Sequence, residues 1–288
     1  MSKPATLLLL CLMFAATAAH ADHYADTYVI PIAGHTTGPN NTVWMTDIVI
    51  RNFSIEPITV EMLFIEAGEM TFDNVFPLVT DTLDGSVTVR GNETVFLRDV
   101  LKGYDQPNVS GAIILGAERP FAVTSRTYNN RFALGQTVPA TGDFLTQTLG
   151  NPDNSAYAYI PGIMQTPTTR TNVGFVAGAG PGGPMVVQFA VRQSAGGIAG
   201  TRNFTIPAGS FEQLQFPVSS VTDAVIDVGT VEVRIVSGDG SVVPYASVVD
   251  GPTGEATFIM GQLPENDTSG ALAFRTNLFR SLFGSRDR

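Results

Sequence analysis

The chain contains one cysteine, Cys11, among its 288 residues. Cys11 lies in an N-terminal apolar stretch that we expect to be removed, so the mature chain is expected to have no cysteine. This excludes disulfide bonds and a cysteine nucleophile, and with only three histidines it leaves too few ligands for a zinc site. The fold must therefore be held together by apolar burial and strand pairing.

Charge is also scarce. Asp, Glu, Lys and Arg make up 15% of the chain, against roughly 25% in typical soluble proteins. Lys3 and Lys102 are the only lysines, and the formal net charge is −10. A surface of that sign repels phosphate backbones, so we expect no nucleic-acid partner.

The first 21 residues are typical of a secretory signal peptide. Lys3 supplies the positive end, Leu7 to Ala16 the apolar stretch, and Ala19-His20-Ala21 a cleavage site before Asp22. The apolar run is too short to span a bilayer, so we expect no transmembrane segment. The residues before Cys11 are leucines rather than the small residues of a lipoprotein signal. We expect cleavage after Ala21 and export to the periplasm or the exterior of a bacterium.

The rest of the chain, with 29 Gly and 18 Pro, reads as short strands between turns. The clearest period-two alternation places Val231, Val233 and Ile235 opposite Glu232 and Arg234. No ten-residue window in either half carries a convincing helical stripe. We expect strands at 27–32, 43–53, 58–66, 86–89, 94–101, 111–115 and 121–128, and at 157–160, 170–176, 185–192, 202–206, 211–216, 228–236, 242–249 and 257–260.

The segment 58–66 differs from a simple half-buried strand. Ile58, Val60, Met62 and Phe64 share one face, which is therefore the core face. The opposite face carries Leu63 and Ile65 as well as polar residues. This pattern predicts that the second face is partly covered.

The two halves of the chain resemble one another. Trp44 to Phe53 (WMTDIVIRNF) returns in weaker form as Arg170 to Ala177 (RTNVGFVA), and each follows a Tyr-Ile-Pro or Tyr-Val-Ile-Pro stretch. Each copy spans about 100 residues, the length of an immunoglobulin-like sandwich of about seven strands. We expect an all-β fold of two tandem immunoglobulin-like antiparallel β-sandwiches.

The duplication sets the expected domain limits. They are a signal peptide at 1–21, a first sandwich at 22–138, a linker at 139–156, a second sandwich at 157–262, and a tail at 263–288 that could form a short amphipathic helix. The linker is rich in Gly, Asn, Asp and Thr, which favour turns.

The order of motifs resembles a known group of proteins. It runs Tyr-Val-Ile-Pro, a Gly/Asn loop, Trp-Met-Thr-Asp-Ile-x-Ile-x-Asn, Ser-Arg-Thr-Tyr-Asn, Tyr-Ile-Pro with Arg-Thr-Asn-Val-Gly, and Tyr-Ala-Ser-Val-Val-Asp. This order is similar to that of uncharacterised secreted bacterial proteins with tandem immunoglobulin-like β-sandwich domains. The resemblance covers residues 28–260. The resemblance implies this fold but does not imply any particular activity.

Candidate catalytic groups are few. A Ser-His-Asp triad needs a histidine base, and only His23 and His35 remain after cleavage; we interpret both as solvated loop residues. Glycoside hydrolysis needs two carboxylates across a cleft, whereas the acids here are scattered. Asp47 is expected to accept backbone hydrogen bonds near a strand end, and Trp44, the sole tryptophan, to pack in a core or between domains.

Metal and cofactor sites are not expected. The loops at 81–86 and 237–241 offer one or two carboxylates each, fewer oxygen ligands than calcium requires. We therefore predict no catalytic residue, no metal and no cofactor.

Two regions are candidate interaction surfaces. Arg126 and Tyr128 share strand parity, so we expect an outward stripe with the arginine stacked on the tyrosine, either as a solvated sheet face or as a partner-binding face. The tail at 269–288 is basic and has apolar residues at near-helical spacing, so it could dock onto its own acidic sandwich, stay frayed, bind a partner, or touch an anionic lipid surface. Its candidate contact residues are Phe274, Arg275, Leu278, Phe279, Arg280, Leu282 and Phe283.

These observations predict an exported, non-enzymatic protein that acts through sandwich surfaces and edge strands in adhesion, envelope structure or extracellular assembly. Its expected partner is another envelope or extracellular protein. The alternative is a secreted carbohydrate-binding module or hydrolase with a site between the two domains; close carboxylates in a cleft there, or an exposed Trp44, would favour it. A viral-capsid-like jelly roll is a third possibility, which the signal peptide disfavours.

Overall fold

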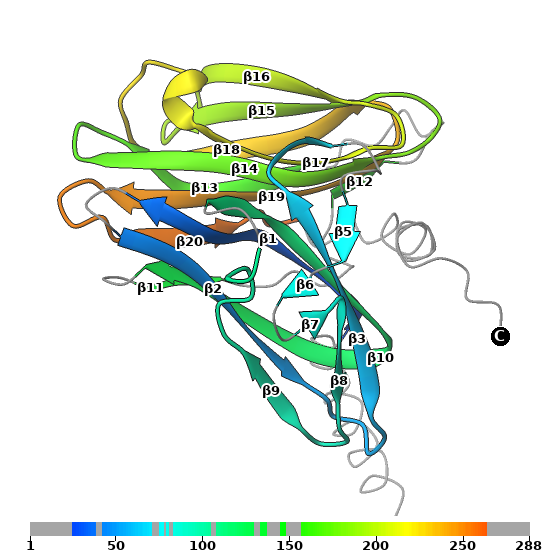
Figure 1. Cartoon of the computed structure of the whole chain (residues 1–288). Coiled ribbons are helices and arrows are strands. Elements are labelled where there is room, and N and C mark those ends of the chain that lie inside the picture. Colours follow the sequence, from blue (N-terminus) through cyan, green and yellow to red (C-terminus); the bar gives the residue numbers. More distant parts are fainter. Residues whose placement is uncertain are drawn as a thin grey trace, which may run out of the picture.

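The computed structural model describes residues 25–38, 42–70, 75–77, 79–80, 83–104, 108–129, 133–136, 145–147 and 157–263. Strands dominate these residues and all their pairings are antiparallel, in a sandwich-like arrangement (Figure 1). Within them the one helical element is a 3-10 turn at Val218–Ser220, and no helix is long and apolar enough to cross a membrane. The predicted all-β class is confirmed. The expected signal peptide and the possible C-terminal helix lie outside the described residues.

The first half forms an eight-stranded sheet that folds over into two layers. Two long strands take part in both layers. β10 (Val109–Asn129) pairs with β3 and then with β2, and β1 (Ala25–Gly38) pairs with β10 and then with β2. The other strands of this half are β2 (Thr42–Arg51), β3 (Ile58–Glu66), β5 (Val75–Pro77), β8 (Ser86–Val89), β9 (Thr94–Leu97) and β11 (Ala133–Gln136), with β6 (Val79–Thr80) and β7 (Leu83–Asp84) as a separate pair.

β10 corrects one expectation. The sequence predicts two strands, at 111–115 and 121–128, and the structure joins them into one. Glu118, Arg119 and Pro120 at the junction are exposed, and Pro120 has no backbone N–H to give to a neighbouring strand. The chain stays extended there while its partner changes from β3 to β2. A turn-like composition therefore marks a change of layer rather than the end of a strand.

The core of the first half lies between its two layers. The alternating face of β3 predicted from the sequence, Ile58, Val60, Met62 and Phe64, is buried in it. The hydroxyl of Tyr28 donates to the carbonyl of Phe121 at 2.6 Å, and the two rings meet edge to face at 5.1 Å. This buried tyrosine closes the two long strands onto each other.

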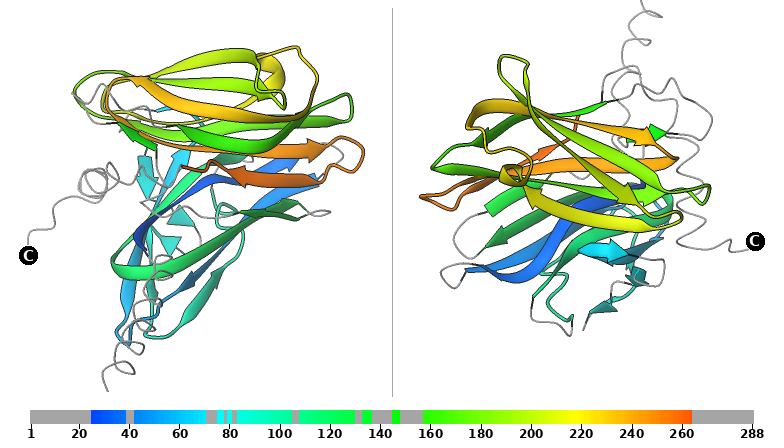
Figure 2. Two further views of the ribbon diagram at one scale, coloured as in Figure 1. Left: turned by 180° about the vertical axis from the view of Figure 1, so that it is seen from behind. Right: turned by 90° about the horizontal axis from the view of Figure 1, so that it is seen from above.

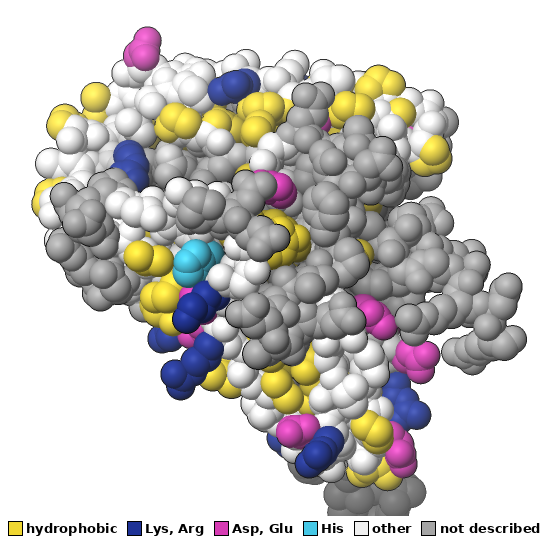
Figure 3. All heavy atoms as spheres, viewed as in Figure 1, with side chains coloured by type: hydrophobic (Ala, Val, Ile, Leu, Met, Phe, Trp, Pro, Cys, Tyr) yellow, Lys and Arg dark blue, Asp and Glu magenta, His cyan; other side chains and the backbone are white. Residues whose placement is uncertain are grey.

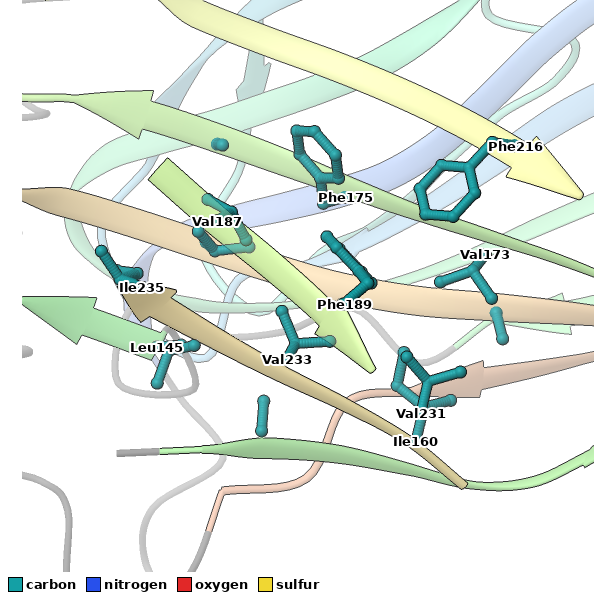
Figure 4. Close-up of a cluster of buried hydrophobic side chains, with 14 of the residues drawn as sticks. Leu145, Ile160, Val173, Phe175, Val187, Phe189, Phe216, Val231, Val233 and Ile235 are labelled. Atoms are coloured by element: carbon teal, nitrogen blue, oxygen red, sulfur yellow. The ribbon is translucent and has the colours of Figure 1, made fainter. Parts of the chain in front are cut away.

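The second half forms two further sheets. One has the order β13-β18-β15-β16. The other has the order β12-β19-β14-β17 with β20 beside β19, and β4 (Gly68–Met70) from the first half of the chain pairs with β17 at its edge. Their core contains an aromatic cluster in which Phe189 touches Phe175 and Phe216 (Figure 4). Phe189 also touches Phe204. The strands are β12 (Leu145–Gln147), β13 (Ala158–Gln165), β14 (Thr169–Ala179), β15 (Met185–Gln193), β16 (Ile198–Ile206), β17 (Phe211–Pro217), β18 (Ile226–Ser237), β19 (Gly240–Asp250) and β20 (Ala256–Met260).

Part of the stretch expected to link the domains has a structural role. Leu145–Gln147 is strand β12, which pairs with β19. Leu145 is 1% exposed and belongs to the core of the second half. This segment therefore adds an edge strand and an apolar side chain to the sheets of the second half.

A third apolar layer joins the two halves face to face (Figure 2). The contact is strengthened by β4 (Gly68–Met70), a first-half segment that pairs with β17 of the second half. Trp44 is partly buried against Val249 and Ala256 of the second half. Of the two packing roles predicted for it, in a core or between domains, the structure shows contact between the halves. The buried residues of the layer, referred to below as the joining layer, are Val29, Ile65, Ala112, Ile114, Val176, Phe211 and Val243.

The second-half sheet that contributes to the joining layer also holds a buried polar pair. The side-chain amide of Gln213 donates to the hydroxyl of Tyr245 at 2.6 Å. Tyr245 is fully buried, and this burial raises the pKa of its hydroxyl. Gly174 makes room for the ring, because a Cβ there would lie 2.5 Å from it. Gly174, which belongs to the repeated motif at 170–177, is therefore required because the ring of Tyr245 lies so close to its backbone.

Candidate binding face

The outward side of β2, β9 and the second part of β10 carries a regular set of side chains. Cross-strand register places Val49 beside Phe96, Asp47 beside Arg126, and Met45 beside Tyr128. The alternate residues, including Ile48 and Ile50, point into the core. We call this outward surface the arginine–aromatic face and define it by Arg51, Phe53, Phe96, Arg98, Arg126 and Tyr128.

Each arginine of the face lies over an aromatic ring. The guanidinium carbon is 4.2 Å from the ring centroid for Arg126 on Tyr128, 5.2 Å for Arg98 on Phe96, and 5.6 Å for Arg51 on Phe53. The stacking predicted for Arg126 and Tyr128 is present. Such contacts contribute about 0.5–1 kcal/mol each at exposed sites, so they also restrict where the guanidinium groups lie. Phe53 and Phe96 remain 46% and 47% exposed.

Asp47 lies at the centre of the face and is 3% exposed. Its Oδ2 accepts a hydrogen bond from Nη2 of Arg126 at 3.1 Å, and its Oδ1 accepts from the hydroxyl of Tyr128 at 3.3 Å. The backbone N–H of Asp99 also donates to Oδ1, at 3.0 Å. The prediction that Asp47 accepts a backbone hydrogen bond is confirmed, and the same carboxylate also fixes Arg126 and Tyr128.

The sequence suggested that His35 is a loop residue, and this prediction was wrong. His35 lies in β1, and its Nδ1 is 2.9 Å and 3.1 Å from the two carboxylate oxygens of Asp99. The strand continues past it because the β-branched Thr36 and Thr37 pair with β2. Asp99 has a φ of 44°, a left-handed conformation that aspartate tolerates better than most residues. This turn brings its backbone N–H to Asp47 and its carboxylate to His35.

The face carries more positive than negative charge. Arg126 forms an ion pair with Asp47, while Arg51 donates to the carbonyl of Asn92 and the hydroxyl of Thr94. Within the described part of the chain, no carboxylate forms an ion pair with Arg51 or Arg98. Figure 3 shows dark blue basic side chains gathered on this part of the surface. Two uncompensated guanidinium groups therefore stand on a chain whose formal charge is −10.

Replacing Asp47 with asparagine is expected to lower the free energy of unfolding by roughly 1–3 kcal/mol, because hydrogen bonds between charged groups contribute about that much. Arg126 would lose its ionic partner. Urea denaturation of both proteins measures the difference. Thr124→Ala, an exposed change on the same strand, is the control and should shift stability by less than about 0.5 kcal/mol. Equal stability of the two variants would contradict this role for Asp47.

The face offers guanidinium groups, which can bind anions, and flat aromatic rings, which can contact apolar surfaces. Among the described residues, no group of three or more His, Cys, Asp or Glu side chains is placed to hold a metal ion. The predicted tail residues, Phe274, Arg275, Leu278, Phe279, Arg280, Leu282 and Phe283, lie outside the described part of the chain.

Sequence reasoning found Arg126 and Tyr128 but missed the other four residues of the face. Arginine and an aromatic residue two positions apart share one side of a strand, and this spacing occurs in Arg51-Asn52-Phe53, Phe96-Leu97-Arg98 and Arg126-Thr127-Tyr128. It also occurs in Arg119-Pro120-Phe121 and Arg202-Asn203-Phe204, which lie elsewhere in the molecule. The spacing alone therefore does not identify the face.

No protein-family model matches the chain, and no curated protein matches it. Two solved structures show a distant likeness. One is the VP2 subviral particle of infectious bursal disease virus, with 10% sequence identity and a TM-score of 0.21, covering 90% of this chain and 85% of that one. The other is a mutant VP2 protein of the same virus in T=1 particles, with 10% identity and a TM-score of 0.21, covering 95% and 90%. Neither likeness is close enough to bear on the function of this chain.

Proposed function

We propose that the chain is an exported, non-enzymatic interaction protein that binds a negatively charged envelope or extracellular partner through the arginine–aromatic face. Its role would be adhesion, envelope structure or extracellular assembly. Within this proposal the chain comprises two immunoglobulin-like sandwiches, at 22–138 and 157–262. The presence of two separate core clusters, one in each half, supports that division.

One observation carries the proposal: Arg51 and Arg98 are held over exposed rings with no ion-pairing carboxylate among the described residues. A guanidinium group can bind a carboxylate through two parallel hydrogen bonds. Holding it in place before binding reduces the entropy that binding would otherwise cost. The same charges would also attract an anionic partner from solution.

The alternative of a sugar-handling site between the two halves has less support. The joining layer is apolar. Trp44, whose exposure would have favoured that alternative, is packed against the second half. The tail remains a separate prediction, because its expected contact with a partner or an anionic lipid surface falls outside the described residues.

Replacing Arg98 with glutamate is expected to weaken binding to immobilised polyanions at least about tenfold at low salt, because a repulsive charge replaces an attractive one. Biolayer interferometry with hyaluronan and poly-L-glutamate surfaces measures the effect on the full chain. Arg170→Glu is the matched control, since Arg170 is an exposed residue of β14 in the second half. Equal losses in the two variants, or no binding to either surface, would contradict the proposal.

A further inference from the structure

We infer that the ligand of the arginine–aromatic face is an anionic polysaccharide whose carboxylates are separated by neutral sugar rings. This inference rests on the proposed function and names the chemical class of the partner. It follows from the spacing of the charges, the exposure of the rings and the position of both on the face of the sheet rather than at its edge.

The spacing comes from the strand register. Phe96 is level with Val49 of β2 and Tyr128 with Met45. The backbone positions of these two rings are therefore four residues apart, about 13 Å at the usual rise per residue. Phe53 lies two residues beyond Arg51, the last residue of β2, so the row of rings continues past Phe96 and is several sugar rings long.

The backbone positions of the arginines lie between those of the aromatic residues. That of Arg51 lies between Phe53 and the level of Phe96. Arg126 is level with Asp47, and Arg98 reaches the same level because it follows Leu97, the partner of Ile48. The side chains fold back from these positions, so that each guanidinium group lies over its own ring and each ring is paired with one cation. A chain polymer that presents both flat and charged units fits this arrangement.

The rings favour a sugar over an acidic peptide. Phe53 and Phe96 are nearly half exposed and have no polar atom, so a ligand that contacts their exposed parts would do so with apolar surface. A pyranose ring has a flat C–H face suited to this contact and a rim of hydroxyls that remains in water. Extended peptides commonly add to a sheet edge through backbone hydrogen bonds, whereas these side chains project from the face.

The charge count favours a sparsely charged polymer. Asp47 neutralises Arg126, which leaves Arg51 and Arg98 as the uncompensated cations. Their backbone positions are about 13 Å apart along the strand direction. A dense polyphosphate would place most of its charges against a chain of formal charge −10, which repels them. Carboxylates spaced by neutral rings avoid that cost.

Titration calorimetry of the full chain with a hyaluronan decasaccharide, poly-L-glutamate and neutral dextran tests the inference. Hyaluronan should bind at least about tenfold more tightly than either of the other polymers. Phe96→Ala should weaken hyaluronan binding about tenfold, as the loss of one stacked ring predicts. Phe96→Tyr, which keeps a ring, should restore it. Ile198→Ala, an exposed apolar change on β16, should leave it unchanged.

The possible failures differ from one another. Poly-L-glutamate binding as tight as hyaluronan, insensitive to Phe96→Ala but lost with Arg98→Glu, would overturn the polysaccharide inference and keep the proposed interaction role. Dextran binding as tight as hyaluronan would overturn the requirement for negative charge. Binding of none of the three polymers would overturn both the inference and the proposed function.

Discussion

Replacing Phe189 with alanine is expected to lower the free energy of unfolding by about 3–5 kcal/mol, the usual cost of removing a fully buried aromatic ring. Phe189 is 0% exposed. Its ring centroid lies 5.5 Å from that of Phe175, 5.6 Å from Phe204 and 5.4 Å from Phe216. Removing it would leave a cavity between the two sheets of the second half and take away three ring contacts together.

Urea denaturation followed by tyrosine fluorescence and far-UV circular dichroism measures this loss, provided that the slope with urea stays constant. Phe96→Ala is the matched control: it removes the same group from a surface position 47% exposed, so it should cost much less. A loss below about 1 kcal/mol for Phe189→Ala would mean that the cluster collapses around the gap or is less tightly packed than described.

Replacing Ile114 with aspartate is expected to lower stability by several kcal/mol, about 3–5 or more, because a buried charge would have no partner. Ile114 is 1% exposed and lies in the joining layer, with Val29 opposite on β1 and Leu63 opposite on β3. The layer belongs to both halves of the molecule. The substitution therefore tests whether the halves depend on each other for stability.

Ile114→Val provides the control, since removing one methylene group in the same place should cost about 0.5–1.5 kcal/mol. Denaturation should be followed by two probes at once, near-UV circular dichroism and the fluorescence of Trp44, which packs across the halves. If the aspartate variant were no less stable than the valine variant, the layer would have to admit water or separate readily.

The sequence predicted local features well. Strand 58–66 agrees with β3, and its predicted partial cover on the second face is explained by Ile65, which the second half buries. The alternation of Val231, Val233 and Ile235 marks the core face of β18. These features depend on residues close together in the chain, where a period of two is sufficient.

The arrangement of strands in space could not be predicted in the same way. The pairing of β2 with β9 joins segments about 45 residues apart, and a shift of one residue would place Phe96 and Arg98 in the core. Asp99 donates its backbone N–H to Asp47 from a left-handed backbone conformation, which the residue types around it do not predict. The candidate face therefore depends on the register between strands. Of its residues, the sequence alone indicated only Arg126 and Tyr128.

The pairing of β4 with β17 has a consequence for how the molecule is made. While the chain is being synthesised, its first half emerges with Val29, Ile65 and Ile114 uncovered, because the strands that bury them come later in the sequence. β4 likewise waits for β17. Uncovered apolar faces and unpaired strands are the surfaces through which nascent chains aggregate. The partly synthesised chain is thus exposed to aggregation, and protection by a chaperone would matter until β19, which supplies Val243 to the joining layer, is complete.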